Sequence, residues 1–294
     1  MAKKLDSIVE LAAQKTREIS ANSGNYMAFL TTAAHKAIDE TPVRLPKPFK
    51  VGLIGGLGPA ATVDLYDKIV KATPAKNDQE HFKLVVEQNP QISDRTACLL
   101  KGGADPTLAM YGCARRLQKD GCDAIIVPCN TAHAFVPYLE RHLDIPFINM
   151  QIATMEEIKA KLGDKARIGL LATSGTVQTG IYGDKAKALN LPMFVPDELH
   201  QERVMAAIYG PLGAKAGYTD GQCREDLVSA AEYLVKTYDC NCLILGCTEL
   251  PLILDECDDF VCAGKEVCVV DPTSALARKV VRIATETNKA RGTR

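Results

Sequence analysis

Two similar segments, 118 residues apart, constrain the fold of this 294-residue chain more than any other feature. Residues 122–131 read CDAIIVPCNT, and residues 240–249 read CNCLILGCTE. In each, a short run of β-branched and aliphatic residues, typical of a buried parallel strand, ends in a cysteine and small polar residues. Ligands bind at the carboxyl ends of strands in an open α/β sheet. Each segment therefore places one thiol, on Cys129 or Cys247, where a site is expected.

A second match in the same register indicates that a whole unit is duplicated. Residues 51–54 read VGLI, and residues 168–171, 117 positions later, read IGLL. Strand-like runs alternate with helix-like runs in both halves, with the strands at 50–54, 83–88, 123–127 and 146–149, and then at 167–172, 192–195, 241–245 and 267–270. We therefore expect an α/β fold of two similar lobes. Each lobe has a roughly four-stranded parallel sheet flanked by helices, and the active site lies in the cleft between them.

The expected parts of the chain are 1–48, a helical extension that ends in a proline-rich linker, 49–150, the first α/β lobe, and 151–271, the second α/β lobe. Three prolines between residues 41 and 48 predict the linker, because proline ends helices and stiffens an extended chain. Pro272 favours the first turn of a last helix. We expect this helix, at about 272–290, to pack back on the first lobe.

The composition argues against several classes of partner. The formal net charge is −1, which gives no electrostatic reason to expect binding to nucleic acid or to an anionic membrane. No apolar run reaches the roughly 18 residues of a membrane helix, and the first residues lack the apolar core of a secretory signal. The eleven cysteines form no obvious disulfide framework, which indicates reduced thiols. We expect a cytoplasmic protein that binds a small molecule.

Two features hint at a metal or a nucleotide, but each has a simpler interpretation. Cys257, Cys262 and Cys268 cluster loosely, yet their spacings do not match those of metal ligands, so we expect small buried side chains and no metal. Residues 55–62, GGLGPAAT, follow a strand and open a helix, which loosely fits a dinucleotide fingerprint with Glu87 at the end of the next strand. We favour a turn that is structural or that holds a carboxylate at a helix N-terminus.

Two basic residues lie on loops from which they can bind a substrate carboxylate. Arg95 follows the second strand, and a guanidinium can bind a carboxylate through two hydrogen bonds. Lys215 lies in a glycine-rich loop, 210–217, in the second half of the chain. The alternatives are a surface arginine paired with Asp94 and a solvated loop lysine.

The residues beside the two cysteines suit proton transfer. A thiol has a pKa of about 8.5, which neighbouring charges and dipoles can change. Asn130, Thr131 and Thr248, with nearby backbone N–H groups, can hold a carboxylate and stabilise charge that develops on it. His133 and Glu249 each allow two interpretations, a group that tunes a thiol or a structural hydrogen-bonding residue. Two facing thiols suggest proton transfer on both sides of one carbon.

Five segments together make the chain resemble the aspartate/glutamate racemase family, and within it the aspartate racemases. They are GGLGPAAT (55–62), NPQISDRT (89–96), PCNTAHAF (128–135), LATSGT (171–176) and GCTEL (246–250). The resemblance covers about residues 50–275, and residues 1–48 extend beyond it. Leu57 stands where methionine is common in the family, a change that conserves volume.

The resemblance implies a cofactor-independent amino-acid racemase with two α/β lobes, often dimeric, and Cys129 and Cys247 as its two acid/base residues. The substrate-binding residues that it implies are Arg95 and Lys215 for a carboxylate, Asn130, Thr131 and Thr248 around the α-carboxylate, and Leu57, Ala132 and Thr173. We therefore expect a homodimer that acts on aspartate or glutamate and uses no cofactor and no metal.

Three other functions fit part of the sequence. A related isomerase, lyase or decarboxylase would also use two cysteines, although Arg95 together with Lys215 favours a dicarboxylate. A nicotinamide-dependent oxidoreductase would use the glycine-rich turn but would leave the paired cysteines without a role. A two-lobed amino-acid-binding protein without catalytic activity would not need both Cys129 and Cys247.

Overall fold

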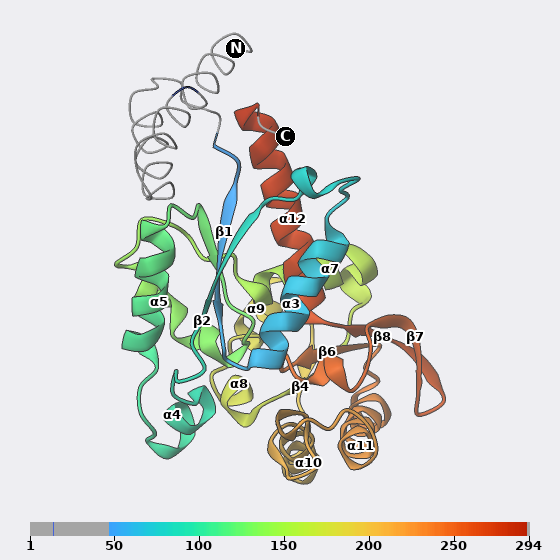
Figure 1. Ribbon diagram of the computed structural model, residues 1–294. Helices are drawn as coiled ribbons and strands as arrows, with labels where there is room; N and C mark the ends of the chain where they lie inside the picture. The colour runs from blue at the N-terminus through green and yellow to red at the C-terminus, as the bar shows by residue number, and fades with distance from the viewer. Residues whose placement is uncertain (1–13, 15–46, 293–294) are drawn as a thin grey trace. The chain divides into compact units, whose positions relative to one another are not determined.

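The structure is a computed structural model, which describes Gln14 and residues 47–292 (Figure 1). The chain divides into two compact units, Met1–Lys47 and Pro48–Arg294. The extension and linker predicted for 1–48 fall, apart from Gln14, Lys47 and Pro48, outside the described residues. All of the elements named below belong to the second unit.

Residues 47–292 contain two sheets, one for each half of the chain. The strands are β1 (Lys50–Gly55), β2 (Lys83–Gln88), β3 (Ala124–Ile126), β4 (Ile168–Ala172), β5 (Met193–Phe194), β6 (Cys242–Gly246), β7 (Cys257–Cys262) and β8 (Lys265–Val270). The first sheet has the order β2-β1-β3, and the second has the order β5-β4-β6-β8-β7. All of these neighbours pair in parallel except β7 and β8.

Helices connect the strands and flank both sheets (Figure 1). They are α3 (Pro59–Ala72), α4 (Arg95–Lys101), α5 (Thr107–Lys119), α6 (Val136–Glu140), α7 (Met150–Leu162), α8 (Ser174–Gln178), α9 (Gly183–Ala188), α10 (Glu198–Tyr209), α11 (Gln222–Tyr238) and α12 (Pro272–Arg291). Pro59 lies in the first turn of α3, and the side chains of Asp197 and Asp271 cap α10 and α12. No helix in this part of the chain is long and apolar enough to cross a membrane.

The two lobes repeat one topology, as the sequence predicted. β1 lies between β2 and β3 just as β4 lies between β5 and β6. The packing repeats as well: a Cβ on Gly52 would lie 2.9 Å from Leu117 of α5, and one on Gly169 would lie 3.0 Å from Leu234 of α11. Both pairs of equivalent residues are 117 positions apart. A glycine in β1 and its equivalent in β4 therefore let a helix pack closely against each sheet.

The first lobe lacks the fourth strand that was expected at 146–149. Phe147 makes only an isolated parallel bridge with Ile125. Pro146 has no N–H to donate, and Asn149 already serves as the N-cap of α7. The chain therefore turns from the sheet edge directly into a helix.

The second lobe has an outer strand, β7, that was not predicted. It pairs antiparallel with β8 through a turn in which Ala263 and Gly264 have φ angles of 52° and 76°. Residues 255–259, DECDD, look like a loop because they are acidic. An edge strand with one solvated face tolerates such residues. The sheet of this lobe is therefore mixed and five-stranded.

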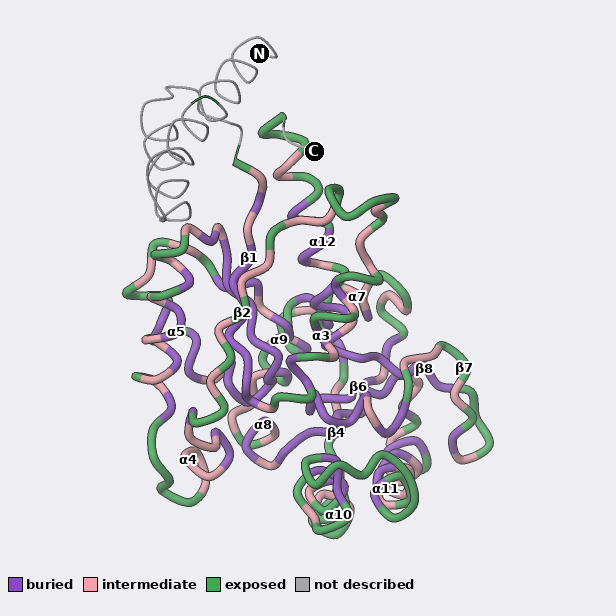
Figure 2. Tube along the Cα trace, in the orientation of Figure 1, coloured by how far each residue is buried: buried purple, intermediate pink, exposed green. Residues whose placement is uncertain are grey.

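Strands β1 and β6 are buried along almost their whole length (Figure 2), and each has a hydrophobic layer on both faces. Ile54 of β1 packs with residues of α5, whereas Val51 and Leu53 pack on the opposite face with residues of α3 and α12. In the second lobe, Leu243 of β6 packs with α10 and α11, and Ile244 packs with α9. The alternation follows from the two-residue period of a strand, and it explains the continuous apolar runs in the sequence.

The last helix, α12, completes the core of the first lobe. Leu276 and Val280 are fully buried and belong to the same hydrophobic cluster as Leu65 of α3. At the start of the helix, Lys68 Nζ lies 2.7 Å from Asp271 Oδ2, so the capping residue of α12 is also ion-paired to α3. The helix thus links the end of the second sheet to the first lobe.

The glycine-rich turn after β1 packs against the loop that leads to Arg95. Gly56 has a φ of +92°, and a Cβ there would lie 2.5 Å from the carbonyl carbon of Asn89. The Gly56 N–H donates to Thr62 Oγ1 at 2.9 Å, and the Asn89 N–H donates to Gly55 O at 3.1 Å. Close packing therefore explains why residue 56 is a glycine, and no bound phosphate is needed to explain it.

We expect Gly56→Ala to lower the free energy of unfolding by roughly 3 kcal/mol, since the left-handed backbone and the steric clash both add to the cost. Gly180→Ala is the matched control, because Gly180 has a φ of +64° but no atom within 4 Å of an added Cβ. The control should lose only about 1 kcal/mol. Urea unfolding of both variants measures the difference, and equal losses would contradict the packing argument.

Candidate active site

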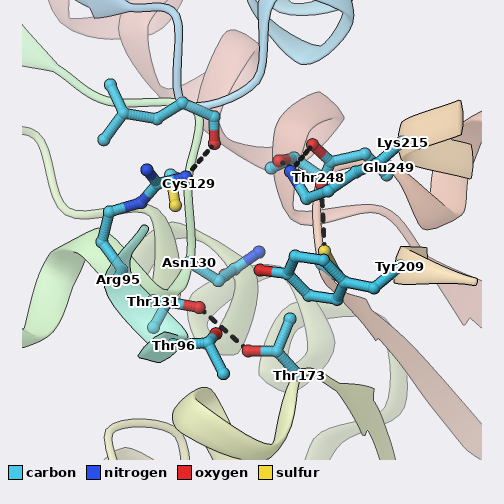
Figure 3. A pocket seen from close by; sticks show the side chains of 12 residues that line it. Arg95, Thr96, Cys129, Asn130, Thr131, Thr173, Tyr209, Lys215, Thr248 and Glu249 are labelled. Carbon is cyan, nitrogen blue, oxygen red and sulfur yellow. Dashed lines mark hydrogen bonds and ion pairs between the residues drawn. The ribbon is translucent and has the colours of Figure 1, made fainter. Parts of the chain in front are cut away.

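Loops at the carboxyl ends of β1, β3, β4 and β6 meet at one pocket between the lobes (Figure 3). The open space among these loops, solvent-filled space included, is about 260 Å³. The described residues that line it are Leu57, Arg95, Thr96, Cys129, Asn130, Thr131, Thr173, Tyr209, Lys215, Cys247, Thr248 and Glu249. A pocket of this size and polarity suits a small charged molecule.

The structure brings together nine of the ten site residues that the sequence suggested. Cys129 and Cys247 follow the equivalent strands β3 and β6, and both are almost completely buried, with 7% and 6% of their surfaces exposed. Ala132 is the exception. It is fully buried in the hydrophobic core of the first lobe and does not line the pocket.

Two lining residues, Thr96 and Tyr209, had not been singled out in the sequence. Thr96 directly follows Arg95 and belongs to the segment 89–96, so the sequence could have predicted that it lies in the site. Tyr209 reaches the pocket from the last residue of α10, and its hydroxyl donates to Asp94 Oδ2 at 3.0 Å. No local pattern marks a tyrosine that enters a site from a helix end.

Arg95 is a buried residue of the pocket, so the surface-arginine interpretation is wrong. Its Nη2 donates to Leu57 O at 2.9 Å, and its Nη1 donates to Ser93 O at 3.0 Å. The guanidinium lies beside Cys129 (Figure 3). Burial by itself lowers the pKa of Arg95, but the charge and hydrogen-bonding interaction with Cys129 outweighs it, and the pKa is raised. Arg95 therefore places a permanent positive charge next to the first thiol.

The second thiol lies beside an ion pair. Cys247 Sγ donates to Glu249 Oε2 at 3.0 Å, and Lys215 Nζ lies 2.6 Å from Glu249 Oε1. Lys215 is therefore not a solvated loop lysine. Burial raises the pKa of Cys247 well above its usual value, and the charge of Glu249 raises it further. Burial lowers the pKa of Lys215, but Glu249 and Cys247 outweigh it and raise the pKa overall.

Hydrogen bonds between the lobes surround the pocket. The hydroxyl of Thr131 lies 3.0 Å from that of Thr173, and Thr248 Oγ1 donates to Pro128 O at 3.1 Å. Tyr182, fully buried in the second lobe, donates to Asn130 Oδ1 at 2.6 Å. This distance is typical of O–H···O bonds and short for an N–H donor, so the Asn130 oxygen faces Tyr182.

His133 has the structural role that the sequence left as one of two interpretations. Its Nε2 accepts the Met150 N–H at 3.2 Å, so the ring proton is on Nδ1, which lies 2.9 Å from Cys129 O. Burial lowers the pKa of His133 to about 4. The ring is therefore neutral at physiological pH and fixes the backbone of the Cys129 loop, not its thiol.

Three donors in the pocket have no protein partner. Six buried polar side-chain atoms among the described residues lack a hydrogen bond, and Arg95 Nε, Thr96 Oγ1 and Asn130 Nδ2 account for half of them. An unsatisfied buried polar atom costs about 1–3 kcal/mol, so native proteins place few of them without a reason. Their concentration here indicates a site for an acceptor such as a carboxylate.

The loose cysteine cluster lies away from this pocket, on β7 and β8. Cys257, Cys262 and Cys268 do not line the pocket, and no group of three or more His, Cys, Asp or Glu residues within the described ranges could hold a metal ion. Cys262 belongs to the hydrophobic core of the second lobe.

Comparisons with known proteins extend over both lobes. The sequence model of the Asp/Glu/hydantoin racemase family matches residues 54–280. The broad specificity amino-acid racemase RacX of Bacillus subtilis is 25% identical over 239 residues, which cover 79% of this chain and 96% of that protein. A glutamate racemase of Aquifex pyrophilus is 30% identical over 168 residues, 56% of this chain and 60% of that protein.

A solved structure has the same fold. The aspartate racemase of Picrophilus torridus is 30% identical, with a TM-score of 0.66, and the match covers 81% of this chain and 94% of that one. The family match runs from the end of β1 into α12, so it includes every residue that lines the pocket.

We expect Tyr182→Phe to lower the free energy of unfolding by about 1–3 kcal/mol, because it leaves the buried Asn130 oxygen without its donor. Tyr111→Phe is the control, since the Tyr111 hydroxyl makes only an exposed 3.4 Å contact with His142 O. Denaturant unfolding of both variants gives the comparison. A Tyr182 variant as stable as the control would show that the Tyr182–Asn130 bond contributes nothing to stability.

Proposed function

The chain belongs to the Asp/Glu/hydantoin racemase family, and from this we propose that it interconverts L- and D-aspartate. In the proposed reaction Cys129 and Cys247 act as the two acid/base residues, and no cofactor takes part. The observation that carries the proposal is the position of the two buried thiols. They follow equivalent strands of the two lobes and line the same small pocket.

The proposed reaction requires one thiolate and one thiol. One cysteine removes the α-proton as a thiolate, and the other delivers a proton to the opposite face as a thiol. The roles exchange for the other enantiomer. The working pair therefore shares one proton, and its two titrations belong to the pair. A bell-shaped dependence of kcat on pH follows.

Charges and donors in the pocket support a dicarboxylic amino acid as the substrate. Arg95 supplies a positive charge that no carboxylate of the described protein compensates, and Lys215, paired with Glu249, can share its charge with a second carboxylate of the substrate. The unpartnered donors on Arg95, Thr96 and Asn130 can bind the α-carboxylate as charge develops on it. Each well-placed donor stabilises such a transition state by about 3 kcal/mol.

Aspartate is the first choice of substrate because the match with the aspartate racemase reaches 30% identity over 94% of that chain. A nicotinamide dinucleotide is disfavoured, because packing accounts for Gly56 and the pocket is small.

Cys129→Ala and Cys247→Ala should each abolish the racemisation of aspartate, since each removes the acid/base residue of one face. The measurement is optical rotation together with α-hydrogen exchange in deuterated water, with both enantiomers of aspartate and glutamate and without added cofactor. Cys257→Ala, on β7, should leave both rates unchanged. Full activity in either of the first two variants would exclude the two-thiol mechanism.

Arg95→Lys should raise the KM for aspartate by about tenfold or more, because lysine keeps the charge but loses the planar, two-pronged donor geometry. Steady-state kinetics of the variant gives KM and kcat, and circular dichroism checks that the variant is folded. A folded variant with the KM of the unchanged protein would remove Arg95 from the substrate-binding residues.

A further inference from the structure

The two thiols have opposite electrostatic surroundings, although they occupy equivalent positions in the two lobes. Arg95 lies beside Cys129 (Figure 3), and Glu249 lies 3.0 Å from Cys247 Sγ. The repeated topology does not require this difference. Asn130 and Thr248 follow the two cysteines, and then Thr131 stands in the first lobe where Glu249 stands in the second.

Contact with Glu249 favours a proton on Cys247. Both side chains are buried, with Glu249 4% exposed, and two anions at 3.0 Å would repel strongly. Lys215 Nζ forms an ion pair with the other carboxylate oxygen of Glu249 at 2.6 Å. A proton in this group is therefore most stable on sulfur, donated toward the carboxylate.

Cys129 faces a positively charged side chain, whereas Cys247 faces a carboxylate. The guanidinium of Arg95 lies beside Cys129 (Figure 3), and Arg95 Nε has no hydrogen-bond partner in the described protein. His133, which bonds to the Cys129 carbonyl oxygen, is neutral. Among the residues that line the pocket, the one carboxylate belongs to Glu249.

We propose that Glu249 is a catalytic residue that sets the order in which the pair ionises, so that the first proton leaves Cys129 and the remaining proton stays on Cys247. The proposal deepens the proposed function and rests on it for the acid/base roles of the two cysteines. In the singly ionised protein, Cys129 is the base and Cys247 is the acid before any substrate binds.

Other charged and titratable groups around Cys247 fit this assignment. Glu249 comes from its own loop, Lys215 and Tyr209 come from the α10 end of the second lobe, and Arg95 and Cys129 lie across the pocket. Burial and Glu249 both raise the pKa of Cys247, and Lys215 lowers it. Removal of the Glu249 charge leaves Lys215 without a counter-ion, so its effect on Cys247 grows.

The order of ionisation has a consequence for turnover. After one reaction the transferred proton is on Cys129, and Cys247 is a thiolate beside Glu249. Release of the Cys129 proton to water and uptake of a proton by Cys247 restore the starting form, with no net change in protons. One enantiomer reacts with the stable form of the protein, in which Cys129 is the thiolate. The other enantiomer requires the less stable form, in which Cys247 is the thiolate. Since the two enantiomers have equal free energies, kcat/KM is equal in both directions, and the asymmetry appears in kcat and KM separately.

The test is a titration of each thiol in the full-length protein without substrate. Iodoacetamide alkylation over a pH series, read peptide by peptide by mass spectrometry, gives the reactivity of each cysteine. Thiolates absorb in the ultraviolet, so the change of absorbance with pH also reports a sulfur that the reagent does not reach. The Cys129→Ser and Cys247→Ser variants assign that change to one cysteine or the other. Cys129 should ionise at lower pH than Cys247.

Glu249→Gln should move the ionisation of Cys247 to lower pH by about one unit or more, which is a tenfold or greater rise in its alkylation at neutral pH. Glu232→Gln removes the charge of a half-buried residue of α11 that is paired with Lys236 and does not line the pocket, so it should change neither thiol. Ionisation of Cys247 before Cys129, or an unchanged Cys247 titration in Glu249→Gln, would overturn the proposal.

These results are distinguishable from a failure of the proposed function, because the titration requires no turnover. The expected titration without α-hydrogen exchange on any amino acid would refute the racemase and leave the order of ionisation intact. Racemisation of aspartate with the reverse order would refute the role of Glu249 alone.

Discussion

The pocket depends on a set of hydrogen bonds that joins the lobes directly behind the two thiols. Asn130 and Thr131 follow Cys129 and contact Tyr182 and Thr173 of the second lobe, and Thr248 follows Cys247 and contacts Pro128 of the first. The same short segments thus provide the sulfurs and hold the lobes together. Buried bonds of this kind are costly to break. The distance between the two sulfurs is therefore tied to the interface itself.

The charges in the pocket follow from its burial. A buried ion is unstable unless it is paired or hydrogen-bonded. Lys215 meets this requirement through Glu249, and Arg95 meets it through backbone carbonyls, which leave its positive charge uncompensated by a carboxylate. The pocket therefore carries both a neutral ion pair and an excess positive charge. This combination favours an anionic ligand in the half that contains Cys129.

The sequence predicted what depends on local pattern and on duplication. The apolar runs predicted most of the strands along the chain, and the matched cysteine segments predicted the duplication and brought most of the pocket residues together. Ala132 belongs to a matched motif, but the short turn after Cys129 directs its methyl group into the core. The acidic edge strand β7 and the entry of Tyr209 from α10 were missed, because both are set by tertiary packing and leave no periodic signal.

The position of α12 affects how the protein is made. Its apolar residues, including Leu276 and Val280, fill the core that β1 and α3 begin at the other end of this unit. During synthesis, the first lobe emerges from the ribosome long before these residues exist. The lobe must therefore wait with part of its apolar surface exposed, and it completes its core only after the strands of the second lobe have been made. The lobe that is made first is therefore the second to become fully stable.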